Sequence, residues 1–283
     1  MLFQCFRIHP SPTIKFIWII ILVLYGVSIE KVSSYAILGG LDSPPSKADD
    51  LHVAYLRHLD LTIELERQRY EKDGRLSLSG TVWEASHVLA DYITHPKIST
   101  RFKDKSLLEL GSGLGLCALA ASHVAARIIA TDSSPTSLCL LKRNTQRYSY
   151  LPGSRPVSVI PLHWGEPIAA EIVNLLQAES QSHPDFVIAS DVVYHGSDRR
   201  GLQSTLEALC GPDTTVILAH TWRADPREDD HYFKSLNLQC REVNPKFFPH
   251  EYQWRGSDGR TTVSIFEFCR DTGLENDNDN SSL

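Results

Sequence analysis

The stretch LLELGSGLGLCALA, residues 107–120, constrains the fold of this chain more than any other feature. An apolar run that ends in glycine and is followed by leucine and alanine at helical spacing predicts a strand, a tight turn and a helix. In α/β sheets, ligands bind beside such a turn, at the carboxyl edge of the strands. The stretch therefore predicts both a fold class and the place of a binding site.

Strand-like and helix-like segments alternate from this turn onward. The predicted strands are residues 106–110, 127–131, 157–162, 185–189 and 215–220. The predicted helices are residues 115–122, 137–147, 168–177 and 202–209. Strands that alternate with helices form a mostly parallel sheet with helices on both faces. We therefore expect an α/β, Rossmann-like fold.

Segments on either side of this core predict further elements. Alternating apolar and polar residues over 59–66 predict a half-buried strand, with Leu76 and Leu78 as its hairpin partner. Apolar residues spaced three and four apart over 81–93 predict an amphipathic helix. REVNPKFF and TTVSIFEFC flank a glycine-containing turn, which predicts an antiparallel hairpin that closes the sheet.

Both ends of the chain differ in composition from the domain, which we expect to occupy residues 51–270. Residues 16–29 form an apolar run behind Arg7 and Lys15, a layout typical of a signal peptide or membrane anchor. The segment 39–50 has the composition of a linker, and the acidic tail 271–283 is expected to be disordered. The sequence leaves two roles open for the N-terminal region 1–50. It associates with a membrane through residues 14–29, or it is a dispensable leader.

Charge and cysteine usage exclude some classes of partner and site. A formal net charge of −6 gives no overall electrostatic footprint for nucleic acid, which is therefore not an expected partner. The six cysteines stand singly, without a C-x-x-C pair, so neither a metal site nor a dense disulfide framework is expected. Single cysteines are typical of a reduced, intracellular protein, which favours the cytoplasm and leaves the nucleus open.

The pattern E-x-G-x-G-x-G at residues 109–115 narrows the ligand. A dinucleotide fingerprint would need glycine or alanine where Leu116 stands, and no Gly-Lys-Ser/Thr of a phosphate-binding loop follows. Glu109 suits a ligand that carries an ammonium or sulfonium charge. Asp132 ends the next strand about twenty residues on, a spacing at which a carboxylate can accept ribose hydroxyls. The turn and Asp132 together point to S-adenosylmethionine as the cofactor.

Five motifs in order give the chain a specific resemblance. VWEASHVLADYI, LLELGSGLGL, ATD, LHWG and IASDVVYH resemble the seven-strand protein lysine methyltransferases of methyltransferase family 16. The resemblance covers residues 51–270 and implies six parallel strands with an antiparallel seventh near one edge. It also implies that the cofactor is contacted by Trp83, Gly111, Ser112, Gly113, Asp132, Trp164 and Ser190. The glycine pattern adds Glu109 to these predicted cofactor residues. Ser190 departs from the alanine common in relatives.

Several of these residue types have physical reasons to serve the cofactor or the acceptor. Trp83 and Trp164 offer flat apolar surfaces to an adenine or a sulfonium, although core packing is the alternative for each. Asp191 and Tyr194 directly follow the strand 185–189, at the carboxyl edge. There Asp191 would orient a lysine amine and Tyr194 would line its channel, because methyl transfer needs a neutral amine aligned with the methyl group. The structural alternative is a helix-capping loop. Arg223 follows the fifth strand, with Trp222, and is expected at the substrate mouth.

The resemblance implies a monomeric, S-adenosylmethionine-dependent protein-lysine N-methyltransferase. Its implied acceptors are folded partner proteins such as chaperones, AAA ATPases or translation factors. The site residues do not by themselves fix the acceptor, so methylation of a histidine, an arginine or a small molecule stays open. A protein that keeps the fold and binds partners without turnover is the alternative that is not an enzyme.

Overall fold

The computed structural model describes residues 51–70, 77–177, 181–223, 226–248 and 262–270. The predictions for residues 14–29, for the linker, for the turn of the C-terminal hairpin and for the acidic tail lie outside the described residues. Within the described residues, no helix is both long enough and apolar enough to cross a membrane.

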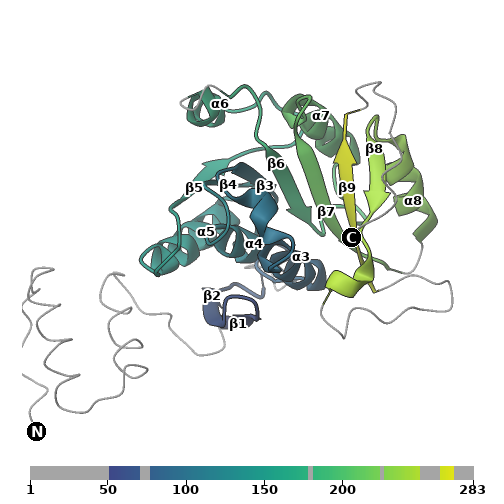
Figure 1. The fold of residues 1–283 in the computed structure, drawn as a ribbon. Helices are drawn as coiled ribbons and strands as arrows, with labels where there is room; N and C mark the ends of the chain where they lie inside the picture. Colours follow the sequence, from purple (N-terminus) through teal and green to yellow (C-terminus); the bar gives the residue numbers. More distant parts are fainter. Residues whose placement is uncertain (1–50, 71–76, 178–180, 224–225, 249–261, 271–283) are drawn as a thin grey trace, which may run out of the picture. The chain divides into compact units, whose positions relative to one another are not determined.

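A seven-stranded sheet in the order β5-β4-β3-β6-β7-β9-β8 forms the centre of the fold (Figure 1). Its strands are β3 (Ser106–Leu110), β4 (Arg127–Asp132), β5 (Val157–Pro161), β6 (Phe186–Ser190), β7 (Thr215–Thr221), β8 (Gln239–Glu242) and β9 (Val263–Cys269). Strand β9 is antiparallel to both of its neighbours, and the other pairs in the sheet are parallel. The mostly parallel sheet expected from the sequence is confirmed, with its antiparallel strand next to one edge.

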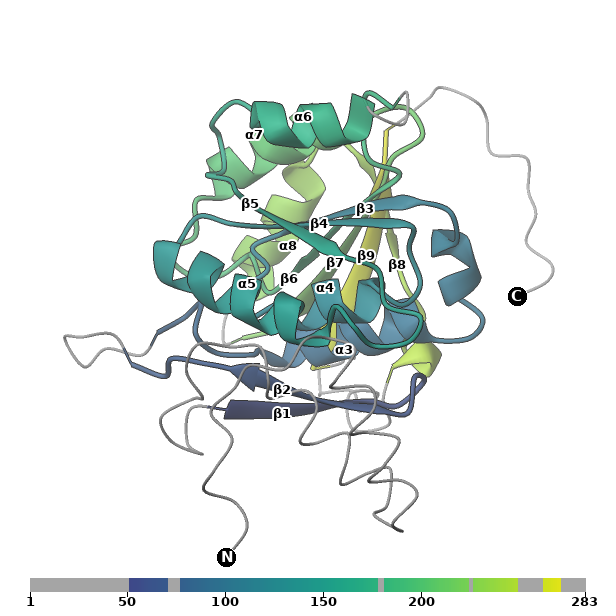
Figure 2. The same cartoon turned by 90° about the vertical axis from the view of Figure 1, so that its left-hand side faces the viewer.

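Helices cover both faces of this sheet (Figure 2). One face carries α3 (Glu84–Thr94), α4 (Leu116–Ala121) and α5 (Pro135–Tyr148), with the short helix η3 (Ser99–Phe102) after α3. The other face carries α6 (Ala170–Gln177), α7 (Arg199–Leu209) and α8 (Pro226–Ser235). The strands are buried on both sides, as expected for a parallel sheet sandwiched between helices.

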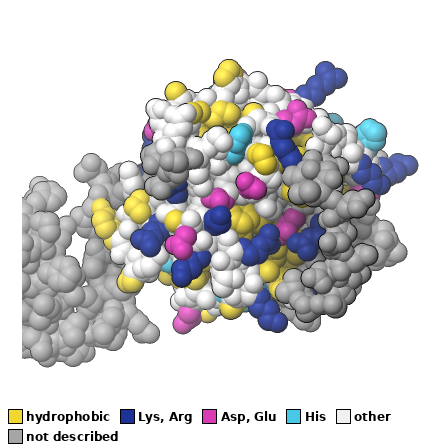
Figure 3. Space-filling view, turned by 45° about the horizontal axis from the view of Figure 1, so that its top comes forward, with side chains coloured by type: hydrophobic (Ala, Val, Ile, Leu, Met, Phe, Trp, Pro, Cys, Tyr) yellow, Lys and Arg dark blue, Asp and Glu magenta, His cyan; other side chains and the backbone are white. Residues whose placement is uncertain are grey.

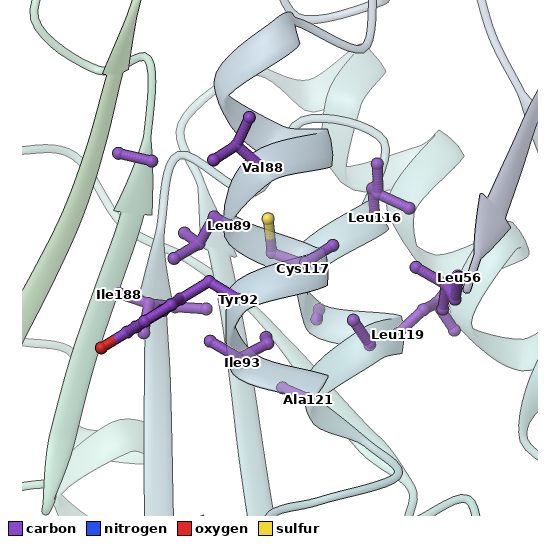
Figure 4. Packing of buried hydrophobic residues seen from close by; sticks show 14 of the residues in the cluster. Leu56, Val88, Leu89, Tyr92, Ile93, Leu116, Cys117, Leu119, Ala121 and Ile188 are labelled. Carbon is purple, nitrogen blue, oxygen red and sulfur yellow. The ribbon is translucent and has the colours of Figure 1, made fainter. Parts of the chain in front are cut away.

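The hydrophobic core is divided by the sheet into two clusters. Successive strand residues alternate between them, so that Leu107 belongs to the cluster of α3, α4 and α5 while Leu108 belongs to the other. Figure 4 shows the first cluster, where Leu89 and Tyr92 of α3 lie close to Cys117 of α4. This packing fixes α4, and with it the glycine turn that precedes α4.

A two-stranded hairpin, β1 (Leu51–Leu56) and β2 (Leu61–Glu66), packs against the first cluster. The prediction of the second strand is confirmed, but the prediction of its partner is wrong. Strand β2 pairs with the segment that precedes it, whereas Leu78 lies in a loop and Leu76 is outside the described residues. A four-residue connection brings β1 and β2 together at once, and Asp60 adopts a positive φ of 49° within it.

The C-terminal part departs from the prediction in two places. Helix α8 was not predicted, because its sequence PREDDHYFKS carries few apolar residues, and Tyr232 and Phe233 alone join the core. The predicted closing hairpin is confirmed by the antiparallel pairing of β8 with β9. Strand β8 ends at Glu242, and a short helix η4 (Pro245–Phe247) follows because Pro245 lacks the N–H that a ladder requires.

On the face shown in Figure 3, Lys and Arg side chains are interspersed with Asp and Glu side chains. Elsewhere in the described residues, charges form ion pairs between segments, such as Lys105 with Asp185 and Arg143 with Glu66. The second of these pairs joins α5 to β2, so it helps to hold the hairpin on the domain.

Candidate active site

A cavity of about 920 Å³ lies at the carboxyl ends of the central strands. This volume is in the range of sites that enclose a small molecule. The predicted residues that line it are Trp83, Gly111, Ser112, Gly113, Asp132, Trp164, Ser190, Asp191 and Tyr194. The structure thus brings together residues from five separate segments of the chain, and of the predicted cofactor and catalytic residues Glu109 is the one that is not in the cavity wall.

The glycine turn between β3 and α4 follows a path that requires glycine. Gly111 and Gly115 have φ angles of +66° and +90°, in the left-handed region that other residues rarely adopt. A Cβ on Gly111 would lie 3.0 Å from Val192 and 3.4 Å from Trp164, and a Cβ on Gly115 would lie 2.5 Å from Leu141. The turn therefore presents bare backbone to the cavity, which allows a ligand to approach closely.

Asp132 joins this turn to the end of β4. One carboxylate oxygen accepts a hydrogen bond from Gly113 N and the other accepts one from Ser134 N, each at 2.9 Å. Ser112 adds a second link, because its backbone N donates to Thr131 O and its hydroxyl accepts from Thr131 N. Asp132 is 8% exposed and lines the cavity, so it can serve a ligand while it also fixes the turn.

Glu109 lies beneath the turn rather than in the wall of the cavity. It is 1% exposed, and burial raises the pKa of its carboxyl to about 8, although hydrogen bonds with Ser112 and Cys117 offset part of that rise. Within the described part of the chain, one of its oxygens has no hydrogen-bond partner. A buried carboxyl of this kind can stay protonated, and a nearby cation would lower its pKa and favour the carboxylate. Its predicted cofactor contact remains a prediction.

Two tryptophans form apolar walls of the cavity. Trp164 is half-buried and lies against the turn beside Gly111. Trp83 immediately precedes α3, and its indole N–H donates to Leu78 O at 2.9 Å. The other side of Trp83 faces Arg223, whose guanidinium carbon lies 5.6 Å from the ring centroid. Both residues line the cavity, where an indole ring offers apolar surface of the kind that an adenine or a sulfonium methyl requires, although part of the Trp83 ring is covered by Arg223.

At the end of β6, Asp191 is held in an unusual backbone conformation with a φ of +57°. Its side chain is 1% exposed and forms an ion pair with Arg223, with Nη2 at 2.7 Å from Oδ2. Thr221 donates to the same carboxylate from both its backbone N and its hydroxyl. The carboxylate raises the pKa of the Arg223 guanidinium above its ordinary value, chiefly through their hydrogen bonds. Asp191 is thus a buried anion compensated by a cation in the cavity wall.

The comparisons with known proteins agree with this arrangement. A family model described as lysine methyltransferase matches residues 64–239, which is more than half of the chain. The chain belongs to the lysine methyltransferase family. Protein N-lysine methyltransferase METTL21A of Danio rerio is 30% identical over 161 residues, which cover 56% of this chain and 69% of the relative. EEF1A lysine methyltransferase 3 of Xenopus tropicalis is 28% identical over 195 residues, which cover 69% and 76%.

Solved structures confirm the fold of this lysine methyltransferase. The T. thermophilus 16S rRNA N2 G1207 methyltransferase, in complex with AdoMet and guanosine, aligns with a TM-score of 0.53 at 12% identity. The alignment covers 86% of this chain and 62% of that chain. Likeness at this identity supports the Rossmann-like methyltransferase fold and nothing finer.

The residues of this methyltransferase fit S-adenosylmethionine, its cofactor. The glycine turn leaves room for backbone contact that any Cβ would fill, and Trp164 adds an apolar wall beside it. Asp132 supplies a carboxylate in the wall, and Glu109 supplies a buried acid below it. Carboxylates suit ribose hydroxyls and an ammonium group, whereas they would repel a pyrophosphate.

Sequence reasoning missed several residues of the site. Leu78 and Ser79, in the loop before α3, line the cavity, and Ser86 of α3 hydrogen-bonds Ser190 across it at 2.9 Å. Thr221 was also missed, although it binds Asp191 twice. Two residues were expected at the mouth of the substrate site. Arg223 lines the cavity, whereas Trp222 is partly buried and packs against the second core cluster. The place of Arg223 directly after the fifth strand was the signal that predicted it, whereas its ion pair with Asp191 was not predicted.

Proposed function

We propose that this chain transfers the methyl group of S-adenosylmethionine to a lysine ε-amine of a folded partner protein. The cofactor supplies an activated methyl group on a sulfonium sulfur. The neutral amine attacks that carbon in line, the nitrogen–carbon bond forms as the carbon–sulfur bond breaks, and the electron pair of the broken bond stays on sulfur. The methylated nitrogen carries the positive charge that the sulfonium loses, and the one proton released to solvent is the one that the lysine ammonium gives up before attack. The observation that supports this most is the family match together with the cavity that its motifs surround.

The residues of the cavity divide into two groups by position. The glycine turn, Asp132 and Trp164 lie at the end of the cavity near β3 and β4, and we assign them to the cofactor. Trp83 lies beside Arg223, and we assign it to the cofactor at its boundary with the acceptor. Asp191 and Tyr194 follow β6, and we assign them to the acceptor. Tyr194 is half-buried, and its backbone N and O are held by the Ser197 hydroxyl, so its ring is carried on a braced loop. Such bracing keeps an acceptor channel in one position.

The substrate class follows from the relatives. The relative from Xenopus tropicalis is named as an EEF1A methyltransferase, and that from Danio rerio as a protein N-lysine methyltransferase. We propose a folded protein of the translation-factor, chaperone or AAA ATPase class as the acceptor, with EEF1A as the first one to test. The exposed side chains Val53 and Tyr55, on the outer face of the hairpin, offer apolar area to such a partner.

The experiment is methyl transfer from radiolabelled S-adenosylmethionine into purified EEF1A and into extract proteins, followed by peptide mass spectrometry. We expect label on a lysine side chain. Label on a histidine or an arginine would replace the proposed acceptor, and label in small molecules alone would exclude a protein substrate. Cofactor binding with no label in any fraction would favour a partner-binding protein without turnover.

We also propose that the protein acts as a monomer in the cytoplasm and that its N-terminal region is not needed for catalysis. The described residues of the cavity wall, from Leu78 to Arg223, all lie well inside the segment 51–270. A chain that begins at Leu51 should therefore remain soluble, elute as a monomer and methylate as fast as the full chain. An insoluble or inactive truncation would contradict this, and fractionation of cells would report whether the full chain is held at a membrane.

A further inference from the structure

The four acceptor positions of the Asp191 carboxylate are taken by its own neighbours. Oδ1 accepts from Thr221 N and from Arg223 Nη1, each at 3.1 Å. Oδ2 accepts from the Thr221 hydroxyl at 3.1 Å and from Arg223 Nη2 at 2.7 Å. An ionised carboxylate offers about four lone-pair sites. A lysine ammonium that reaches Asp191 therefore finds its hydrogen-bonding capacity filled.

Arg223 is fixed in the cavity wall by three contacts. Besides its two-pronged pair with Asp191, Nη1 donates to Thr221 O at 3.2 Å. The guanidinium also lies over the ring of Trp83, which is itself tied to Leu78 O. The side chain remains 43% exposed. The structure thus places a held positive charge, rather than a free one, at the acceptor end of the cavity.

The other charges around this pair determine what an incoming amine meets. Three acids interact electrostatically with Arg223: Asp191 after β6, Glu84 of α3 and Asp229 of α8. His220 of β7 interacts electrostatically with both Asp191 and Arg223. The remaining titratable groups in the cavity wall are Asp132, His163, Tyr194, His195 and Asp198. At the acceptor end of the cavity, Asp191 is a buried acid, and the positive charge of Arg223 compensates its negative charge. A protonated lysine therefore meets a neutralised carboxylate and a cation of its own sign.

We propose that Arg223 is a specificity-determining residue that admits the acceptor lysine as the neutral amine. This inference rests on the proposed lysine methylation. At pH 7.4 roughly one free lysine in a thousand is neutral, yet only that form has a lone pair to attack carbon. Next to Arg223 the ammonium gives its proton to solvent on entry. The lone pair then forms the nitrogen–carbon bond while the carbon–sulfur bond breaks toward sulfur.

The test uses the full chain and a probe that needs no partner protein. The probe is an S-adenosylmethionine analogue with nitrogen in place of sulfur and an aminobutyl arm in place of the methyl group. Its control carries a butyl arm without the amine. Calorimetric titrations in two buffers of different ionisation enthalpy report how many protons leave on binding, and the difference between the two probes isolates the terminal amine. We expect the wild-type chain to release a proton from that amine.

Three variants separate charge from shape. Arg223→Met leaves Asp191 unpaired, so the arm should bind as the ammonium, without proton release and about tenfold or more tighter at pH 7.5, since a one-unit pKa change is tenfold in affinity. Arg223→Lys keeps the charge and should keep the proton release. Arg143→Met is the matched control, because Arg143 also pairs with a buried glutamate, is 42% exposed and lies outside the cavity wall. It should behave as wild type.

The outcomes distinguish the inference from the function on which it rests. Wild-type binding of the amine arm without proton release overturns the inference and leaves lysine methylation standing. Proton release that persists in a folded Arg223→Met chain also overturns it. If the amine arm adds no affinity over the butyl control at any pH, the cavity has no site for a lysine amine. That result would contradict both the proposed lysine methylation and the inference about Arg223. A structural role alone would weaken both probes equally and leave the proton count unchanged.

Discussion

Asp132 gives the most demanding prediction, because the structure assigns it two tasks. Its carboxylate accepts from Gly113 N and Ser134 N, each at 2.9 Å, and it lines the cavity that we assign to the cofactor. The sequence by itself predicts that Asp132→Ala weakens the cofactor with little change in stability. The structure adds a stability cost, because two backbone donors lose a charged acceptor at a site that is 8% exposed.

The magnitudes follow from the number of bonds. Hydrogen bonds to a charged group contribute about 1.5 to 3 kcal/mol each, and partial replacement by water leaves a cost of roughly 2 to 4 kcal/mol for Asp132→Ala. Loss of the ribose contacts should weaken S-adenosylmethionine by about 1.5 to 3 kcal/mol, or roughly 10- to 150-fold. Asp132→Asn keeps one acceptor oxygen, so its stability should lie between those of the other two chains.

Urea unfolding without cofactor measures the first quantity, and calorimetric titration of the folded variants measures the second. Asn244→Ala is a control that removes a helix cap outside the cavity wall, where the Asn244 Oδ1 accepts from Lys246 N. It should lose stability but keep its affinity. A folded Asp132→Ala chain with unchanged affinity would refute the cofactor assignment. Unchanged stability would refute the reading of the two backbone hydrogen bonds.

Asp191→Asn and Tyr194→Phe should bind S-adenosylmethionine nearly as wild type yet lose methyl transfer by about 100-fold or more. The double variant should be barely worse than the poorer single one, because both residues shape one acceptor site, Asp191 by holding Arg223 and Tyr194 by lining the cavity. Single-turnover transfer measures this, and near-normal rates would contradict it. Burial raises the pKa of Glu109 to about 8, so the stability that its protonated form contributes should be complete below pH 4.5 and lost as pH rises toward 8. Glu109→Gln should lack that several-kcal/mol loss in urea unfolding, whereas the exposed Glu64→Gln should retain it. Asn144 is fully buried and hydrogen-bonds the backbone of β2 and Leu114 O of the glycine turn. Asn144→Leu should therefore cost about 2 to 4 kcal/mol of stability and also weaken cofactor binding. An unchanged affinity for the cofactor would show that the hairpin and the turn are independent.

The parts of the fold that the sequence predicts are those with strong local patterns. The five parallel strands from 106–110 to 215–220 are bounded by turn residues, so each was predicted within about two residues of its observed limits. Helix α8 has too few apolar residues to show a helical period. The partner of β2 depends on which neighbouring segment packs against α3, and the alternation of apolar and polar residues does not reveal that tertiary contact.

The site shows the same division between local and tertiary information. The glycine turn and Asp132 were predicted because both lie at strand ends whose spacing is visible in the chain. Glu109 lies in a strand that is buried on both faces, so its sequence position does not say which way it points. The pair of Asp191 with Arg223 requires β6 and β7 to be neighbours (Figure 1), and a sheet order is not written in any one segment.

We infer that this cavity supports the transfer of a methyl group to a lysine of a folded protein. The most direct test of this inference is mass spectrometry of EEF1A and extract proteins after incubation with S-adenosylmethionine and either the wild-type chain or Asp191→Asn. We expect a lysine side chain that gains the mass of a methyl group with the wild-type chain and gains none, within the same time, with the variant. Methylation of an arginine or a histidine, or lysine methylation to equal extent by both chains, would contradict it.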